Sequence, residues 1–169
     1  MLETAIFAGG CFWCTTQAFD EIDGVYEVVS GYTDGHVINP TYQQVKKQDT
    51  GHVEATRFTY DPKIFSYEEL LDIYWQIIDP TDDKGQFQDR GPSYAPVIFY
   101  TNDIQKIQAL NSREKLIQSN EYNKPIVVKI KPATTFYLAE EYHQDFHKKE
   151  IERMKLEKEE RKNYQKKRR

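Results

Sequence analysis

The sequence predicts an α/β or α+β domain in which helices pack against a mixed β-sheet. The main observation is an alternation along the chain. Short apolar segments bounded by Gly, Pro and Asp, such as residues 4–8 and 51–60, alternate with longer segments of helical period. The second observation is the size of the chain, because 169 residues with 38 % hydrophobic and 30 % charged residues fit one globular domain with a single core.

Five apolar segments are predicted strands, at residues 4–8, 25–31, 51–60, 97–100 and 126–130. Helices are predicted at residues 11–22, 67–78 and 103–119, and from residue 138 onward. The second helix follows Ser66-Tyr67-Glu68-Glu69, the pattern of a capping box. Its inward face is expected to hold Tyr67, Leu70, Leu71, Tyr74, Trp75 and Ile78, and that of the third helix Ile104, Ile107, Leu110 and Ile117. The polar segments 33–48 and 79–94 are predicted loops, which we expect to meet over the sheet end that holds Cys11.

The charge of the chain is unevenly distributed. Residues 148–169 contain eleven Lys or Arg and five Glu, a balance of +6, so the net charge of −4 leaves −10 for residues 1–147. A basic segment can bind nucleic acid or an anionic membrane. A mixture of Glu, Lys and Arg is more often a solvated helix, which we favour. We therefore expect residues 151–169 to be a charged helical extension. Deletion of the residues after about Arg153 should remove almost no apolar surface and leave the chemistry intact.

The sequence predicts a cytoplasmic protein. No apolar segment approaches the length that spans a bilayer, and Met1-Leu2-Glu3 lacks the basic start of a secretory signal. The two cysteines, Cys11 and Cys14, are too close in sequence for their disulfide to stabilise a fold much, and the cytosol would reduce it. A redox-active pair or a metal site is the better interpretation of this spacing.

Cys11 is the strongest candidate for a reactive group. Gly9-Gly10 after a strand permits a sharp turn, which places Cys11 at the start of a helix. The helix dipole and free backbone N–H groups there favour a thiolate, with a pKa lowered to roughly 3.5–7.5. Cys14 lies three residues further, on the same helical face and within disulfide reach. A pair of inert core cysteines is the less favoured alternative.

A metal-binding module is a second interpretation of the cysteine pair. His143 and His147 have H-x₃-H spacing, which together with C-x₂-C gives a set of zinc ligands. The two halves are, however, much further apart than in compact zinc fingers. His143 also lies in an aromatic helical stretch, where a packed, hydrogen-bonded histidine is the favoured role. We therefore expect no metal.

Glu54 is a candidate proton donor. In a strand, it shares a face with Phe58 and Tyr60, and a carboxylate on an apolar face is costly unless it is paired or protonated. Burial would raise its pKa and make it a general acid. A strand-end Glu that reaches solvent is an equally open interpretation of this residue alone.

Several short motifs, in order, resemble the A-type peptide methionine sulfoxide reductases. The residues that carry the resemblance are Gly10-Cys11-Phe12-Trp13, Gly31-Tyr32, Asn39-Pro40-Thr41-Tyr42, Gly51-His52-Val53-Glu54, Asp79-Pro80-Thr81, Asp89-Arg90-Gly91 with Tyr94, and Tyr142-His143-Gln144-Asp145. The resemblance implies a ferredoxin-like α/β core with a mixed sheet. It also implies that residues 1–150 form the catalytic domain, followed by the extension at residues 151–169.

The resemblance assigns a role to each matching residue. It implies that Cys11 is the nucleophile and that Glu54 gives a proton to the sulfoxide oxygen. The implied substrate-binding residues are Phe12 and Trp13 for the methyl group, Tyr42 and Tyr94 for the oxygen, and Asp89 for the polar side of the site. The implied substrate is the S epimer of methionine sulfoxide, in proteins or as the free amino acid.

Cys14 is the one other cysteine of the chain and therefore the only candidate for a resolving cysteine. Many members of the family carry resolving cysteines in a Gly-rich C-terminal tail, which a charged helix replaces here. We therefore expect Cys14 to resolve a sulfenic acid on Cys11, thioredoxin to reduce the resulting disulfide, and the enzyme to act as a monomer without cofactor, nucleic acid or membrane. Thr16, Ser93 and Ala95-Pro96 depart from the family pattern around the pocket. A general dithiol–disulfide oxidoreductase remains the alternative enzyme.

Overall fold

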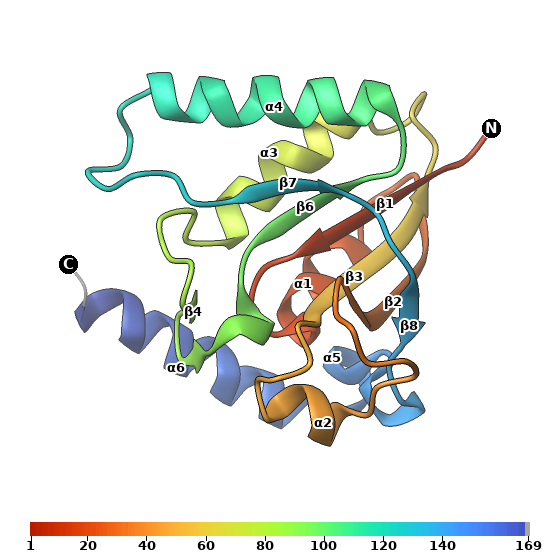
Figure 1. Cartoon of the computed structure of the whole chain (residues 1–169), viewed down its shortest axis with the longest axis vertical. Coiled ribbons are helices and arrows are strands. Elements are labelled where there is room, and N and C mark those ends of the chain that lie inside the picture. The colour runs from red at the N-terminus through yellow and green to blue at the C-terminus, as the bar shows by residue number, and fades with distance from the viewer. Residues whose placement is uncertain (168–169) are drawn as a thin grey trace.

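The computed structural model describes residues 1–167, so the last two residues of the predicted extension lie outside the described residues. Its centre is a six-stranded sheet in the order β7–β6–β1–β3–β2–β8 (Figure 1). The strands are β1 (Glu3–Ala8), β2 (Val25–Thr33), β3 (Val53–Tyr60), β6 (Val97–Tyr100), β7 (Lys129–Pro132) and β8 (Phe136–Leu138). A small second sheet pairs β4 (Gly85–Gln86) with β5 (Asp89–Arg90).

The connectivity confirms the predicted fold class. The helices are α1 (Phe12–Asp20), α2 (Tyr42–Lys46), α3 (Tyr67–Ile77), α4 (Asp103–Gln118), α5 (Phe146–Lys149) and α6 (Ile151–Lys167), with 3₁₀ turns η1 (Pro92–Tyr94) and η2 (Glu141–His143). The succession β1-α1-β2-β3-α3-β6 with spatial order β6–β1–β3–β2 is the ferredoxin-like arrangement. The sheet is mixed, because β6 and β7 pair in parallel and the other neighbours pair antiparallel.

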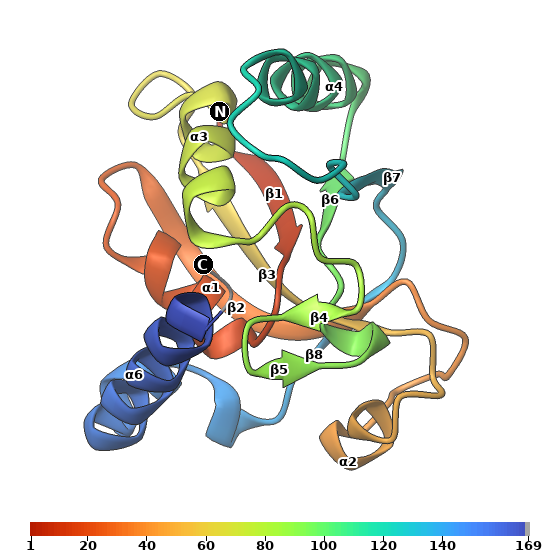
Figure 2. The same ribbon diagram turned by 90° about the vertical axis from the view of Figure 1, so that its left-hand side faces the viewer.

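The main core lies between the sheet and helices α1 and α3, which cover the same side of it (Figure 2). Phe7 of β1 is at its centre, with its ring centroid 5.3 Å from Phe19 of α1 and 5.1 Å from Tyr74 of α3. The predicted inward face of α3 is confirmed, since all six residues are buried, and Ser66 and Glu69 form the predicted capping box. The high aromatic content of the chain is therefore explained largely by core packing.

The predicted inward face of α4 is wrong. Ile104, Ile107, Leu110 and Ile117 are 68, 58, 37 and 43 % exposed, and the buried residues of the helix are Gln105 and Ala109. The Gln105 side chain donates to the carbonyl of Thr4 at 2.9 Å and accepts from the backbone of Thr101 at 2.9 Å. These bonds satisfy one main-chain group near the start of β1 and one just after β6, and they turn Gln105, instead of the isoleucines, towards the protein.

The end of the sheet also differs from the prediction. The apolar run at residues 126–130 is only partly a strand, because Val127 bonds to the carbonyl of Pro80 at 2.8 Å and Val128 packs into the core. The residues that pair with β6 are instead those of the more polar β7. The edge strand β8 was not predicted, since its Leu138 is 60 % exposed and the segment shows no clear alternation. The helix predicted from residue 138 onward is therefore wrong at its start, because Leu138 ends β8 and the α-helices begin at Phe146 and Ile151.

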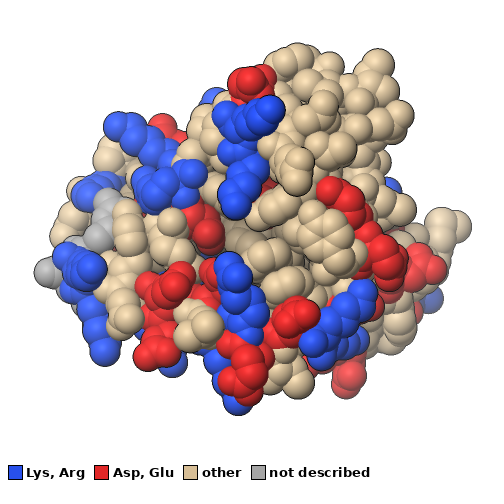
Figure 3. Space-filling model, turned by 90° about the horizontal axis from the view of Figure 1, so that it is seen from below, with Lys and Arg blue, Asp and Glu red and all other residues tan. Residues whose placement is uncertain are grey.

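Helix α6 is not a freely solvated extension. Met154 is 3 % and Glu157 7 % exposed, and the Gln88 side chain donates to the Glu157 carboxylate at 3.1 Å. The expectation that residues after Arg153 bury almost nothing is therefore wrong. The sequence did not reveal this burial because the few residues of α6 that face the protein stand among many charged residues. Figure 3, which views the side of α2, α5 and α6, shows acidic and basic side chains interspersed. Within residues 1–167, no helix is long and apolar enough to cross a membrane.

Candidate active site

Cys11 caps the N-terminus of α1, as predicted from the two glycines before it. Its carbonyl accepts hydrogen bonds from the backbone of Cys14 at 3.1 Å and Thr15 at 3.4 Å, which starts the helix. Gly10 has φ +81°, and a Cβ on it would lie 2.8 Å from the Cβ of Gln86. Only glycine fits this position without strain. The turn therefore fixes where the Cys11 sulfur emerges from the sheet.

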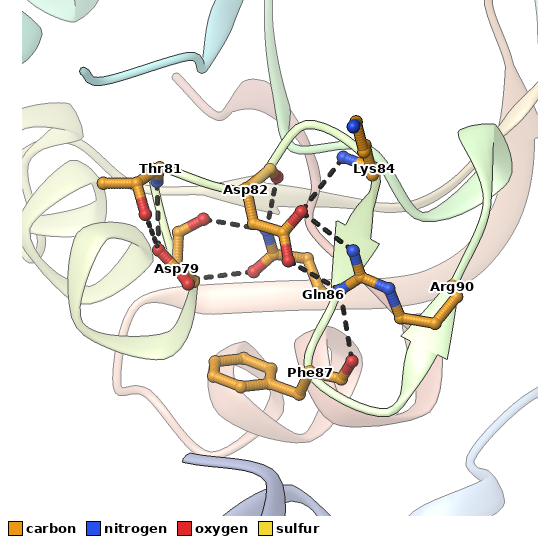
Figure 4. A network of polar contacts seen from close by, with 7 residues as sticks. All are labelled: Asp79, Thr81, Asp82, Lys84, Gln86, Phe87 and Arg90. Carbon is orange, nitrogen blue, oxygen red and sulfur yellow. Dashed lines mark hydrogen bonds and ion pairs between the residues drawn. The ribbon is translucent and has the colours of Figure 1, made fainter. Parts of the chain in front are cut away.

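A polar network holds Gln86 against Gly10 (Figure 4). The Gln86 amide accepts from the backbone of Asp79 at 2.7 Å and donates to the carbonyls of Asp79 and Asp82 at 2.8 and 3.1 Å. Arg90 closes the network with two bonds to the Asp82 carboxylate, at 2.6 and 3.1 Å. The Asp79-Pro80-Thr81 and Asp89-Arg90-Gly91 motifs thus brace the turn that presents Cys11.

Cys11 is not the low-pKa thiol that the helix start suggested. It is 8 % exposed, and burial raises the pKa of its thiol well above the ordinary value. The negative charges of Glu54, Cys14 and Asp89 act in the same direction, while a hydrogen bond from the backbone of Trp13 opposes them. The predicted lowering of the pKa is therefore wrong, because exclusion of water outweighs the helix terminus. The resting site holds a thiol.

Glu54 lies beside Cys11 and is buried, which answers the question that the sequence left open. Its side chain projects from β3, is 2 % exposed and accepts a bond from the backbone N–H of Phe12 at 3.2 Å. Burial raises the pKa of its carboxyl to about 8, and the charge of Asp89 adds to this. The Phe12 N–H and a hydrogen bond from Tyr94 partly oppose the shift. Glu54 is thus mainly protonated at pH 7, with its proton available at the site.

Tyr42 and Tyr94 come from the two long loops, which do meet at the site. Gln48 joins the loops, because its amide donates to the Ser93 hydroxyl and accepts from the Ser93 backbone, both at 2.8 Å. The Tyr94 carbonyl also accepts from Gly10 at 3.1 Å. Burial, and next the charge of Glu54, raises the pKa of both tyrosines, so their hydroxyls remain donors.

Glu140 fixes Tyr42 in a way that the sequence did not reveal. One carboxylate oxygen accepts from the Tyr32 hydroxyl and the other from the backbone of Tyr42, both at 2.9 Å. Burial opposes the charge of Glu140, but these hydrogen bonds hold its pKa below the ordinary value. The charged form is therefore the one that anchors α2. Glu140 stands beside Glu141 just before the Tyr142-His143-Gln144-Asp145 motif, and the sequence showed no pattern that would have distinguished it.

Phe12 and Trp13 form an aromatic wall together with the Tyr142-His143-Gln144-Asp145 segment. Phe12 is fully buried, with its ring centroid 5.0 Å from His143, whereas Trp13 is partly exposed. Trp13 stacks on Phe146 at 3.8 Å and donates its indole N–H to Nδ1 of His143 at 3.0 Å. Trp13 is thus the aromatic side chain of the pair that a ligand can touch.

The four residues of the metal alternative do not converge. His143 is buried and engaged with Trp13, as predicted, and burial lowers its pKa. His147 bonds to the Asp20 carboxylate at 3.0 Å. Over residues 1–167 no group of three or more His, Cys, Asp or Glu side chains could hold a metal ion. The geometry thus lends no support to a metal-binding module built on Cys11 and Cys14.

Asp89 lies at the boundary between the site and α6. Burial raises its pKa to about 6, with a further upward contribution from Glu157. Arg161 and Arg153 of the same helix act in the opposite direction. The sequence did not link α6 to the site. The only available signal was the spacing of Arg153, Glu157 and Arg161, which recur every fourth residue and so share one helical face.

The departures from the family pattern are accommodated by local hydrogen bonds. Thr16 is buried, and its hydroxyl bonds to those of Ser30 at 2.8 Å and Thr56 at 3.1 Å. Ser93 forms the two bonds to Gln48 that join the loops. Ala95 packs against the second face of the sheet. Ser93 and Ala95 flank Tyr94 in the chain, whereas Thr16 links α1 to the sheet, and none of the three belongs to the Cys11–Glu54 pair.

Comparisons with known proteins agree with this geometry. A family model described as peptide methionine sulfoxide reductase matches residues 3–169. The peptide methionine sulfoxide reductase MsrA of Leuconostoc mesenteroides is 57 % identical over 156 residues, which is 92 % of this chain and 91 % of the relative.

Solved structures show the same architecture. The reduced form of Mxr1 from Saccharomyces cerevisiae superposes with a TM-score of 0.83 at 28 % identity, covering 89 % of this chain and 86 % of Mxr1. Mxr1 in complex with Trx2 superposes with a TM-score of 0.59 at 20 % identity, covering 86 % and 84 %. At that identity the second likeness concerns the fold alone.

Proposed function

Since the chain belongs to the peptide methionine sulfoxide reductase family, we propose that Cys11 is its nucleophile and Glu54 its general acid. The enzyme is an oxidoreductase that reduces methionine sulfoxide. The observation that carries the assignment is the placement of the Glu54 carboxyl, which is buried and bonded to the backbone of the residue after Cys11. An acid and a thiol meet there in a site from which water is largely excluded.

The first step transfers the sulfoxide oxygen to Cys11. The Cys11 sulfur attacks the sulfoxide sulfur while Glu54 protonates the oxygen, which makes the oxygen a better leaving group. The attack forms a bond between the two sulfur atoms, and the S–O bond of the substrate breaks. The released oxygen then bonds to the Cys11 sulfur as a hydroxyl while the S–S bond breaks, so methionine leaves and Cys11 is a sulfenic acid. The thiol proton of Cys11 replaces the one that Glu54 gave, so the step consumes no net proton. Methionine sulfur is reduced and Cys11 sulfur is oxidised.

The remaining site residues bind the substrate. Tyr42 and Tyr94 donate hydrogen bonds to the sulfoxide oxygen, and their raised pKa values keep those protons in place. Trp13 contacts the methyl group, with Phe12 supporting the wall from behind. Asp89 orders the polar side. This chiral arrangement of apolar and hydrogen-bonding walls selects one epimer, which we assign as the S epimer, in proteins or as the free amino acid.

The chemical assignment is tested with dithiothreitol and the separate S and R sulfoxides of an N-acetyl-methionine ester. We expect methionine ester from the S epimer only. Glu54→Gln should slow the single turnover by roughly 10²–10⁴-fold, as expected for loss of a general acid. Rates within a few-fold of wild type would exclude that role. A protein that chiefly reduced disulfides instead would be the general dithiol oxidoreductase.

Cys14 resolves the sulfenic acid, and thioredoxin reduces the disulfide. Cys14 supports this role because it lies in the first turn of α1, and both cysteines are free thiols. The yeast protein Mxr1, whose reduced form is 28 % identical to this chain, is also solved in complex with Trx2, which is consistent with a thioredoxin as reductant. A cytoplasmic location fits a cycle that depends on a reducing compartment.

Replacing Cys14 tests the resolving role. Cys14→Ser should form about one methionine per enzyme and then stall with thioredoxin, while dithiothreitol restores some turnover because it attacks the sulfenic acid directly. Mass spectrometry of oxidised wild type should show the Cys11–Cys14 bond. Full-rate cycling of Cys14→Ser with thioredoxin would mean that the reductant attacks Cys11 itself.

A further inference from the structure

Two exposed cations lie against two of the aromatic residues that we assign to substrate binding. The ammonium of Lys46 is 5.8 Å from the centre of the Tyr42 ring. The guanidinium carbon of Arg153 is 5.8 Å from the centre of the Trp13 ring. Both rings pack on His143, whose ring centroid is 4.4 Å from that of Tyr42 and 5.7 Å from that of Trp13. One continuous aromatic cluster therefore carries a cation at two of its members.

The two cations come from different sides of the site. Lys46 ends α2, one helical turn after Tyr42, and Arg153 lies in the first turn of α6. Figure 2 shows α2 and α6 well apart, with the start of α1 between them. Figure 3 shows a hollow near the centre of this side of the molecule, with charged side chains of both signs around it. A peptide that enters the site therefore passes between Lys46 and Arg153.

The donors of both cations are available to a ligand. The Arg153 side chain is 57 % exposed, and its Nε donates to the Glu157 carboxylate at 3.0 Å. Among the described residues this is the only hydrogen-bonding partner of Arg153, so both Nη groups are left for a ligand. Lys46 is exposed, and its ammonium has no hydrogen bond or ion pair within residues 1–167.

The carboxylates of the same region are less available than the cations. Glu157 is 7 % exposed and also accepts from the Gln88 amide at 3.1 Å. Glu140 uses both of its carboxylate oxygens to hold Tyr32 and the start of α2. Asp89 is partly buried. Guanidinium and ammonium groups both bind carboxylates, and a guanidinium can do so through two parallel hydrogen bonds. The free donors therefore fit a ligand that carries carboxylates.

We propose that Lys46 and Arg153 select peptides in which acidic residues flank the methionine sulfoxide. The inference rests on the proposed binding of the sulfoxide by Trp13 and Tyr42. With the sulfoxide at these rings, the Nη groups of Arg153 bind a carboxylate on one side of the methionine, and Lys46 binds one on the other side. Successive residues of an extended peptide are about 3.3–3.6 Å apart, so Asp or Glu one or two positions from the methionine can reach the cations.

The free amino acid fits this arrangement less well. It carries a single carboxylate together with an ammonium, so it satisfies one cation and is repelled by the other. An acidic peptide with blocked ends offers a carboxylate to each. Two cations on different sides of the site therefore favour flanking acidic side chains over the α-carboxylate of the substrate.

The expected size of the preference follows from the exposure of the two cations. An exposed ion pair changes an equilibrium by roughly two- to fivefold, so two pairs should give about four- to 25-fold. Neither cation contacts the reacting atoms, so the preference should lie in KM and not in kcat. It should shrink in 1 M salt, where charges are screened beyond about 3 Å.

The test compares two peptides as S sulfoxides, with dithiothreitol as reductant. One is acetyl-Asp-Ala-Met(O)-Ala-Asp-amide, and the other has Asn in place of both Asp residues. We expect wild type to favour the acidic peptide by about four- to 25-fold in kcat/KM. Arg153→Gln and Lys46→Gln should each lower this ratio by roughly two- to fivefold, and the double variant should bring it close to one. Comparing the ratio within each variant cancels any effect on the chemistry that the two peptides share.

Lys162→Gln is the matched control for Arg153→Gln. Lys162 is an exposed cation of the same helix, nine residues further and so on the opposite face of α6. This variant should keep the wild-type ratio. A loss of preference equal to that of Arg153→Gln would mean that net charge and not the position of Arg153 matters, and would overturn the proposal.

Three further results decide the proposal. A wild-type ratio near one, or a ratio that survives in the double variant, would overturn it. N-acetyl-methionine sulfoxide with a free carboxylate, if it depended on both cations as strongly as the acidic peptide, would show that the α-carboxylate is the ligand and would also overturn it. Failure of wild type to reduce either peptide would count against the proposed function instead. Binding of both peptides to Cys11→Ser, followed by tryptophan fluorescence, measures the preference without chemistry and should give the same ratio.

Discussion

The strongest quantitative prediction concerns Glu54 and the stability of the fold. Its carboxyl has an ordinary pKa of 4.5 and a folded pKa of about 8. Between these values the folded protein binds a proton that the unfolded chain lacks, so stability is greatest at low pH and falls as the pH rises towards 8. At about 1.4 kcal/mol per pH unit, the whole loss is roughly 5 kcal/mol. That is a large part of the total stability of a typical domain.

Glu54→Gln removes this titration while keeping an oxygen that accepts from the Phe12 N–H. The difference in unfolding free energy, variant minus wild type, should therefore rise by about 1.4 kcal/mol per pH unit and level off above pH 8. Between pH 5.5 and 7.5 it should grow by about 3 kcal/mol. Subtracting wild type cancels the titration of other groups, apart from the coupling of Glu54 to Asp89.

Urea unfolding under reducing conditions, followed by tryptophan fluorescence, measures this difference at each pH. Glu121→Gln is the matched control, because it makes the same substitution at an exposed carboxylate after α4, far from the site in sequence. If the Glu54→Gln difference also stayed constant between pH 5.5 and 7.5, the carboxyl would be charged in the fold. The argument for Glu54 as a neutral acid would then be refuted.

Three further predictions follow from the geometry. Cys11→Ser should abolish sulfoxide reduction with an unchanged circular dichroism spectrum, and clear residual turnover would disprove its role as nucleophile. Gly10→Ala should lower stability by about 1–3 kcal/mol in urea titrations, because alanine at φ +81° is strained and its Cβ meets Gln86; wild-type stability would show that the turn can relax. Truncation after Arg153 should cost roughly 2 kcal/mol, since it removes the buried Met154, and an unchanged melting temperature would restore the view of α6 as a solvated appendage.

The sequence predicted the alternating strands and helices of the core well, because these elements have strong local signals, whereas the ferredoxin-like order of the strands was implied by the family resemblance. The inward face of α3 and its capping box were both correct, since a helix packed flat on a sheet has the pure period of an amphipathic helix. The predicted face of α4 was wrong because Gln105 of that helix satisfies main-chain groups of Thr4 in β1 and of Thr101 after β6, while the apolar side chains face outward. The period of the apolar residues identifies one face of a helix, but it does not show whether that face packs against the protein or faces solvent.

The sequence identified the residues that meet at the site, but it did not identify the protonation state of Cys11. Cys11, Glu54, Tyr42 and Tyr94 are brought together as the motifs implied, although their roles remain predictions until tested. The protonation of Cys11 was wrong, because burial depends on long-range packing that no local motif contains. The packing of α6 was missed for the same reason, since the partners of Arg161, Ile77 and Phe87, lie far from it in sequence.

The bond between Glu54 and the Phe12 N–H has a consequence for the moment after proton transfer. Once Glu54 has given up its proton, its new negative charge lies at the N-terminus of α1, where the backbone N–H groups and the positive end of the dipole favour an anion. The helix terminus thus stabilises the conjugate base of the acid and not the resting nucleophile. It lowers the free energy of a charge that exists only during turnover, and the thiol proton of Cys11 then returns Glu54 to its neutral state for the next substrate.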